Sequence, residues 1–177
     1  MARIPYPDTQ DPALNLLPAP LNIFRMVGHA APLLRPLAEL GMTNLRTGTL
    51  SPRLRELIIL TVASVCRCQY VRAQHETIAL DAGMTSFELS TIADNARTPA
   101  TLAESEASAV AATVELLRDH TWSDRTVAIL RQHYDHRQIV ELTITTGYYA
   151  MLSGIMNGLD IDIDPAGERF TEMANRR

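Results

Sequence analysis

Apolar residues recur every three or four positions from Leu21 onward, and the strict alternation that is typical of a strand is nearly absent. This spacing collects apolar side chains on one face of a helix. Ser51-Pro52 supplies an N-cap followed by proline at the first helical position, and Gly83 stands where a left-handed residue would end a helix. We predict about seven or eight helices, at 21–28, 32–46, 52–64, 66–82, 86–95, 102–120, 124–134 and 136–157.

Further capping signals refine these boundaries. A hydroxyl residue followed three positions later by an acid forms a capping box, in which each side chain satisfies the other's backbone N–H. Thr85 with Glu88 and Thr101 with Glu104 both fit this pattern. We also expect Ser123 and Asp135 to cap two helices, and Gly158 to end the last one.

The first twenty residues lack this helical pattern. They hold prolines at 5, 7, 12, 18 and 20 among polar residues, so we expect residues 1–20 to form an extended Pro-rich arm. Such arms often wrap a neighbouring subunit. Residues 21–177 are then expected to form a single all-helical domain, because no change of composition divides them.

Composition sets the class of protein and excludes some functions. The chain has 177 residues, of which 46% are hydrophobic and 20% charged, which suits one compact core. A net charge of −4 with scattered arginines does not predict nucleic-acid binding. The N-terminus has no apolar signal-peptide core, and the run from Leu57 to Val65 is far shorter than the roughly 20 residues that span a bilayer. We therefore expect a cytoplasmic protein that does not enter membranes.

Three residues of chemical interest lie close together in the sequence. Cys68 and His75 are seven residues apart, about 20° short of two helical turns, so on one helix they would share a face. Glu56 would join them from the preceding helix. The set suits acid/base and nucleophilic chemistry. The alternative is that Cys68 is a small buried apolar residue and His75 a hydrogen-bonded core histidine.

This spacing resembles that of the carboxymuconolactone decarboxylase family, which includes the alkylhydroperoxidase-D-like proteins. The resemblance rests on Glu56, Cys68 and His75, on the preceding run 50–56, and on the Gly-Met-Thr turn at 83–85. It extends over most of the chain. It implies an all-α bundle of the alkylhydroperoxidase-D-like type, assembled as a homo-oligomer (dimer, trimer or hexamer), without a cofactor.

The peroxidase branch of this family carries Glu, then Cys-x2-Cys-x3-His. Glu56, Cys68 and His75 match three of these positions, but Val71 replaces the second cysteine. The redox dithiol is therefore incomplete. Cys66 and Cys68, which are two residues apart, would point about 200° apart on a helix, which disfavours a bridge between them.

Two further pairs, Tyr70 with Arg72 and Glu141 with Tyr148, are candidates for binding a substrate. Tyr70 and His75 match the Tyr-Glu-Trp-x-x-His pattern of relatives that lack the cysteine pair, while Val71 and Arg72 replace the acid and the tryptophan. Arg72 is expected either to face a carboxylate of the substrate or to be a solvated surface arginine.

Glu141 and Tyr148, seven residues apart, share a face of a mostly apolar helix. A carboxylate in such surroundings needs a partner. Glu141 is expected either to bind substrate or to pair with an arginine or a backbone donor across a subunit interface.

A metal site is not predicted. His133, Asp135 and His136 straddle a helix break, and no further cysteine or histidine lies nearby.

The leading functional hypothesis is acid/base chemistry, such as decarboxylation or isomerisation of a small organic acid or lactone, with Glu56 and His75 as acid and base and Cys68 as a polarisable participant. The second hypothesis is a thiol-dependent peroxidase in which Cys68 becomes a sulfenic acid that Cys66 or an external thiol resolves. The third is a non-catalytic oligomeric binding protein.

Overall fold

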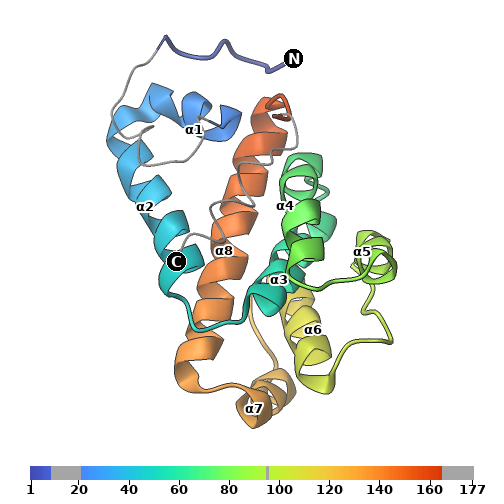
Figure 1. Cartoon of the computed structure of the whole chain (residues 1–177). Coiled ribbons are helices and arrows are strands. Elements are labelled where there is room, and N and C mark those ends of the chain that lie inside the picture. The colour runs from blue at the N-terminus through green and yellow to red at the C-terminus, as the bar shows by residue number, and fades with distance from the viewer. Residues whose placement is uncertain (9–20, 95, 165–177) are drawn as a thin grey trace.

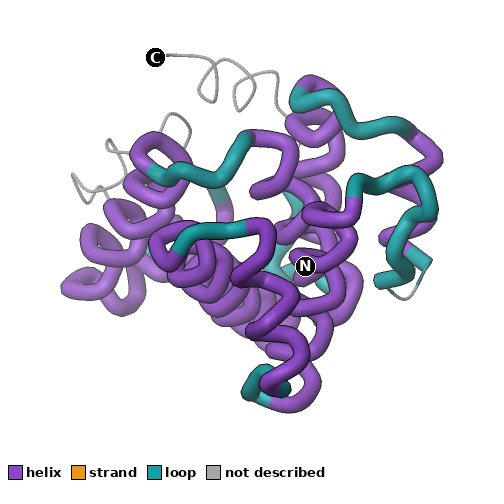
Figure 2. Tube along the Cα trace, turned by 90° about the horizontal axis from the view of Figure 1, so that it is seen from below, coloured by secondary structure: helices purple, strands orange, loops and turns teal. Residues whose placement is uncertain are grey.

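The chain folds into helices joined by loops, with no strand in the part that the structure describes (Figure 2). The computed structural model describes residues 1–8, 21–94 and 96–164. Each predicted helix is present, which confirms the all-helical fold class. The helices are α1 (Asn22–Val27), the 3-10 turn η2 (Gly28–Ala30), α2 (Ala31–Thr47), α3 (Pro52–Val65), α4 (Gln69–Asp81), α5 (Ser86–Ala93), α6 (Glu104–Asp119), α7 (Asp124–His133) and α8 (His136–Leu159).

Helix α3 is the centre of the bundle. Ten of its fourteen residues are buried, and it packs against α4, α5, α6 and α8. In Figure 1, α1 and α2 lie on one side of the long α8, and α3 to α6 lie on the other. No helix in the described part of the chain combines the length and the apolar character needed to cross a bilayer.

The helix ends follow most of the capping signals. Ser51, Ser123 and Asp135 each accept a backbone N–H at the start of α3, α7 and α8, and Thr85 with Glu88 forms the expected capping box. The predicted box at Thr101 and Glu104 is wrong, because α6 begins at Glu104. Glu106 instead accepts the N–H of Ala103.

The last helix also ends differently from the prediction. It continues through Gly158 to Leu159, and Asp160 takes the left-handed conformation (φ 50°) that glycine was expected to supply. The N–H of Ile161 then closes the helix on the carbonyl of Met156 at 3.0 Å.

Residues 1–8 are not helical and lie against the same chain. Arg3 N–H donates to Leu159 O at 2.8 Å, the Tyr6 hydroxyl bonds Asp162, and the Arg25 guanidinium covers the Tyr6 ring. This part of the expected arm therefore packs on α1 and the end of α8. The remainder of the arm, residues 9–20, and the end of the expected domain, residues 165–177, lie outside the described residues.

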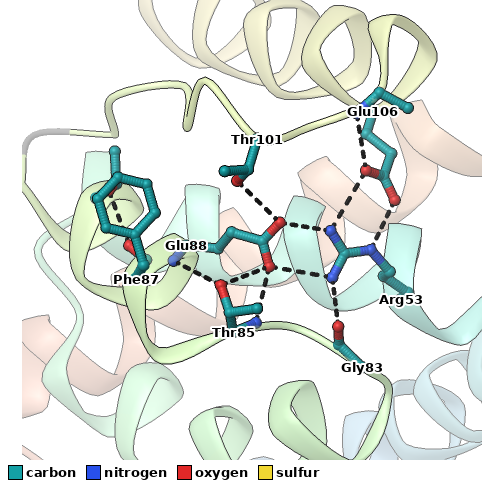
Figure 3. A network of polar contacts seen from close by, with 9 residues as sticks. Arg53, Gly83, Thr85, Phe87, Glu88, Thr101 and Glu106 are labelled. Carbon is teal, nitrogen blue, oxygen red and sulfur yellow. Dashed lines mark hydrogen bonds and ion pairs between the residues drawn. The ribbon is translucent and has the colours of Figure 1, made fainter.

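One arginine joins three helices. Arg53 at the start of α3 lies between two acids, with Nη2 at 2.7 Å from Glu88 of α5 and Nε at 2.8 Å from Glu106 of α6 (Figure 3). It also donates to Gly83 O at 2.7 Å in the turn after α4. Glu88 is buried, and the hydrogen bond from Arg53 lowers its pKa to about 2. Arg53 therefore fixes how α4, α5 and α6 are arranged around α3.

We predict that Arg53→Met lowers the free energy of unfolding by about 3 kcal/mol, because it leaves the buried carboxylate of Glu88 without its cation. Arg35→Met is the matched control: its pair with Glu39 is exposed, so the loss is below about 1 kcal/mol. The contribution of Glu88 to stability is complete above its unfolded pKa of about 4.3 and is lost as the pH falls toward 2. Urea unfolding of both variants and wild type between pH 2 and 7 measures both effects. Equal losses in the two variants would contradict the assignment.

Candidate active site

The chain reverses direction between α3 and α4 at Cys66, Arg67 and Cys68. Arg67 N–H bonds Ser64 O at 3.1 Å and Cys68 N–H bonds Ala63 O at 2.8 Å, which is the Schellman pattern of a helix end. Arg67 takes the left-handed position of this motif with φ 52°. The equivalent position at the end of α4 is occupied by Gly83, with φ 91°. An arginine therefore holds a conformation that favours glycine.

This reversal corrects the predicted helix over 66–82. Helix α4 begins at Gln69, and Cys68 is its N-cap residue in an extended conformation. Cys66 ends α3, so the argument that the two thiols point apart on one helix does not hold. Both cysteines are free thiols.

Glu56 and His75 form a buried hydrogen-bonded pair. The Nδ1 atom of His75 on α4 lies 2.8 Å from Oε2 of Glu56 on α3, and the residues are 6% and 1% exposed. Glu56 thus joins His75 from the preceding helix, as the spacing predicted. Its second oxygen, Oε1, is buried without a hydrogen-bond partner among the described residues. A buried carboxylate with a free oxygen is a candidate proton acceptor.

Helix α8 closes the pair from the other side. The Tyr149 ring meets the His75 ring edge to face at 5.1 Å. Burial and the charge of Glu56 raise the pKa of Tyr149 well above its usual value, so the phenol stays neutral. The pair therefore lies in a dry environment between α3, α4 and α8, where its hydrogen bond is strengthened.

Cys68 occupies a different position, at the start of α4. Its sulfur lies 3.7 Å from the sulfur of Met156 on α8.

A cavity of about 300 Å³ opens beside Cys68, between the reversal, α4 and α5. Its volume is at the low end for small-molecule sites. Glu56 and His75 do not line it. Its walls are formed by Leu60, Ala63, Ser64, Arg67, Cys68, Gln69, Arg72, Glu76, Leu89, Ile92 and Ala93.

Arg72 lines this cavity, as its predicted binding role requires, but it is also paired. Its Nε atom lies 2.6 Å from Oε1 of Glu76, one turn later on α4, and both side chains are partly exposed. The structure thus places Arg72 at the cavity wall with a neighbouring carboxylate.

Tyr70 lies away from the cavity. Its hydroxyl donates to Asp164 in the segment after α8 and accepts from the N–H of Ile23. Gln74 donates to Asp164 O at 2.9 Å. Burial and the Asp164 carboxylate raise the pKa of Tyr70. In this position Tyr70 fastens the segment after α8 to α4 and α1.

Glu141 and Tyr148 have separate surroundings, and neither lines the cavity. Glu141 accepts from the N–H of Thr49 at 2.6 Å and from Arg137 at 2.8 Å. Burial opposes its ionisation, but these donors outweigh burial and lower its pKa. These partners, an arginine and backbone donors, belong to the same chain.

Tyr148 packs onto α2. Its hydroxyl donates to Leu37 O at 3.1 Å, and a Cβ atom on Gly41 would lie 2.3 Å from that hydroxyl. Gly41 therefore permits the close approach of α2 and α8, and Tyr148 serves that packing.

Sequence reasoning missed most of the cavity wall. Arg67, Gln69 and Glu76 lie next to the predicted site residues, but their side chains carry no motif of their own. No sequence signal marked Arg67, because the end of α3 after Val65 and the left-handed conformation of Arg67 are properties of the structure. No group of three or more metal-binding side chains occurs within residues 1–8, 21–94 and 96–164.

Comparison with known proteins agrees with this architecture. Residues 31–115 match the model of the carboxymuconolactone decarboxylase family. The fold is similar to that of an uncharacterised peroxidase-related protein from Ralstonia eutropha JMP134, described as an alkylhydroperoxidase AhpD core. The TM-score is 0.77 at 15% identity, over 98% of this chain and 96% of that one. No curated protein sequence matches the chain significantly.

Two further solved structures share the fold. A peroxidase-related protein from Silicibacter sp. TM1040 has a TM-score of 0.77 at 14% identity, over 92% of each chain. The debrominase Bmp8 has a TM-score of 0.72 at 14% identity, over 93% of this chain and 89% of that one. A cysteine-to-alanine variant of that debrominase has been solved with 2,3,4-tribromopyrrole. At these identities the likeness shows the alkylhydroperoxidase-D-like fold and no more.

We predict that Arg67→Gly raises the free energy of unfolding by about 0.5–1 kcal/mol, because removing the Cβ penalty of about 1–2 kcal/mol is partly offset by the greater backbone entropy of glycine in the unfolded chain. Gly83→Ala is the matched opposite change. A Cβ atom there meets nothing within 4 Å, so its cost of about 1 kcal/mol comes from the backbone conformation alone. Thermal and urea unfolding of both variants measure the two changes. A loss of stability in Arg67→Gly would show that the guanidinium contributes more than the backbone costs.

Proposed function

This chain belongs to the carboxymuconolactone decarboxylase family through residues 31–115, and on that premise we propose that it is a thiol-dependent enzyme that reduces a small organic hydroperoxide at Cys68. One observation carries the proposal. Of Glu56, Cys68 and His75, it is Cys68 that lines the cavity, at the N-terminus of α4. Cys68 is 1% exposed, but of these three residues it is the one that a substrate in the cavity would contact.

The proposed reaction begins with the Cys68 thiolate. Its sulfur attacks one peroxide oxygen, so that an S–O bond forms and the O–O bond breaks. The sulfur is oxidised to a sulfenic acid, and the peroxide is reduced to an alcohol. The departing alkoxide takes up the proton that the thiol lost. We propose that the Glu56–His75 pair holds that proton temporarily, since the pair lies buried between α3 and α4, the two helices that Cys68 connects.

A thiol must then return Cys68 to its reduced form. An external thiol attacks the sulfenic sulfur and releases water, and a second thiol frees Cys68 and leaves as a disulfide. Cys66 is the internal alternative. Burial and the neighbouring Cys68 raise the pKa of Cys66, which keeps it as the less reactive thiol at neutral pH. Since Val71 replaces the second cysteine of the dithiol pattern, we favour an external thiol.

Acid/base catalysis on an organic acid or lactone, the leading hypothesis from sequence, is the second candidate. The buried hydrogen bond between Glu56 and His75, with one oxygen of Glu56 unpartnered, supports it. It ranks second because neither residue lines the cavity. In this mechanism Cys68 would shape the site without being oxidised.

The expected homo-oligomer stays a prediction. Helix α8 carries no charged residue from Leu142 to Leu159, and Val140, Ile144 and Met151 on it are exposed. A face of this kind is typical of a surface that another protein covers. Sedimentation of the purified chain tests the prediction directly.

We predict that stoichiometric cumene hydroperoxide oxidises Cys68 to a sulfenic acid that dimedone traps, in wild type and in Cys66→Ser alike. Cys68→Ser gives no adduct and loses more than about 99% of peroxide turnover with an added thiol, because the nucleophile is gone. Peptide mass spectrometry locates the adduct, and peroxide consumption gives the rate. An unmodified Cys68 in wild type would contradict the proposal.

We predict that Glu56→Gln slows the oxidation of Cys68 about 100-fold, the usual contribution of a proton-transfer residue, and changes its pH profile. The amide keeps the shape of the side chain, and circular dichroism checks that the helices are retained. The same variant separates the two candidates. If Cys68→Ser keeps full turnover on an organic acid or lactone and Glu56→Gln abolishes it, acid/base catalysis replaces thiol chemistry.

A further inference from the structure

The cavity beside Cys68 carries an arginine whose charge is not neutralised. Arg67 lines the cavity and is exposed, and no acidic side chain in the described part of the chain pairs with its guanidinium. Arg53, by contrast, is held between two acids. The free guanidinium is thus available to a ligand.

The backbone of Arg67 is in the left-handed region. The position requires φ 52°, and a left-handed residue other than glycine costs about 1–2 kcal/mol. At the end of α4 the same motif uses Gly83. Ala96, His120 and Asp160 also have positive φ and do not line the cavity, so what distinguishes Arg67 is its charge at the cavity wall. Here the conformation sets a guanidinium directly before Cys68 in the chain.

The charged side chains of the cavity wall have a net positive charge. Arg67 and Arg72 contribute +2 and Glu76 contributes −1, so the wall carries a net charge of +1. Glu76 accepts a hydrogen bond from Nε of Arg72, so its carboxylate is paired with Arg72 on the same helix and not with Arg67. Gln69 adds a neutral polar group. A neutral ligand would leave this positive charge without a counter-charge, whereas an anion would supply one.

The remaining wall is apolar. Leu60 and Ala63 from α3 and Leu89, Ile92 and Ala93 from α5 line it. Burying a compact hydrocarbon body against these side chains is favourable by about 25 cal/mol for each Å² removed from water. The cavity therefore combines a cationic part with an apolar part.

We propose that Arg67 makes this cavity selective for a small amphipathic anion, whose anionic group binds the guanidinium and whose apolar body lies against α5. Reaction of the bound anion with Cys68 rests on the proposed function, whereas binding of the anion does not. Arginine suits the role because its planar fork binds a carboxylate through two parallel hydrogen bonds. Since Arg67 and Cys68 are adjacent, a bound anion presents the rest of its body to the thiol.

Calorimetric titration of the full chain with 4-isopropylbenzoate and with its uncharged amide tests the binding. The two probes share the apolar body and differ in charge. We expect the carboxylate to bind wild type at least tenfold more tightly than the amide, and Arg67→Met to remove this difference. Arg67→Lys keeps the positive charge without the planar guanidinium and should retain part of the difference in affinity. A carboxylate that binds no better than the amide overturns the proposal.

The control is Arg125→Met, which removes one exposed positive charge from α7 and alters the net charge equally. It should leave the preference for the carboxylate unchanged. If Arg67→Met and Arg125→Met weaken binding alike, the effect is one of net charge and the proposal is wrong. All titrations are made at 0.15 M salt, where distant charges are screened.

The same probes separate this inference from the proposed function. Carboxylate preference without a sulfenic acid at Cys68 refutes peroxide reduction and keeps the anion site. Oxidation of Cys68 with equal binding of the two probes refutes the anion site alone. If both hold, the hydroperoxide of 4-isopropylbenzoate should oxidise Cys68 with a KM at least tenfold below that of its methyl ester, and Arg67→Met should remove that difference.

Discussion

The structure depends on burying α3 on nearly all sides. A charged side chain that a buried helix carries is stabilised by a partner, since an unpaired buried charge is costly. Two such side chains of α3 fix its neighbours: Arg53 holds α5 and α6 through Glu88 and Glu106, and Glu56 holds α4 through His75. Burial of one helix thus determines both the arrangement of the bundle and the position of the Glu56–His75 pair.

The fold was largely predictable because its signals are local. The 3.6-residue periodicity and the caps at Ser51, Thr85 and Asp135 act within one or two turns, and the helices they predict are present. Besides the capping box at Thr101 and Glu104, the errors occur where a residue other than glycine ends a helix. Arg67 and Asp160 hold left-handed conformations that tertiary contacts impose, and single-residue preference does not reveal them. The predicted helix over 66–82 is present as α4, but its start was placed three residues too early for this reason.

The site was predictable only in part. Spacing and family resemblance selected Glu56 and His75, which form a pair, and Cys68, which is the N-cap residue of the helix that carries His75 but is not part of that pair. The cavity was not predictable, because its wall needs α5, which contributes Leu89, Ile92 and Ala93 through tertiary packing. Tyr70 shows the converse. Its motif position suggested substrate binding, yet its partner is Asp164, 94 residues later, a contact that no local pattern encodes.

The separation of Cys68 from the Glu56–His75 pair follows from the reversal between the two helices. Had α3 continued through Cys68, the thiol would have been one more side chain of a buried helix, without access to a cavity. The Schellman turn instead brings Cys68 to the N-terminus of α4 and turns Arg67 to the cavity wall. A glycine would make that turn at lower cost but would bring no charge to it. The left-handed arginine and the thiol at the start of α4 therefore both result from one turn, and the chemistry that we propose for the cavity depends on both.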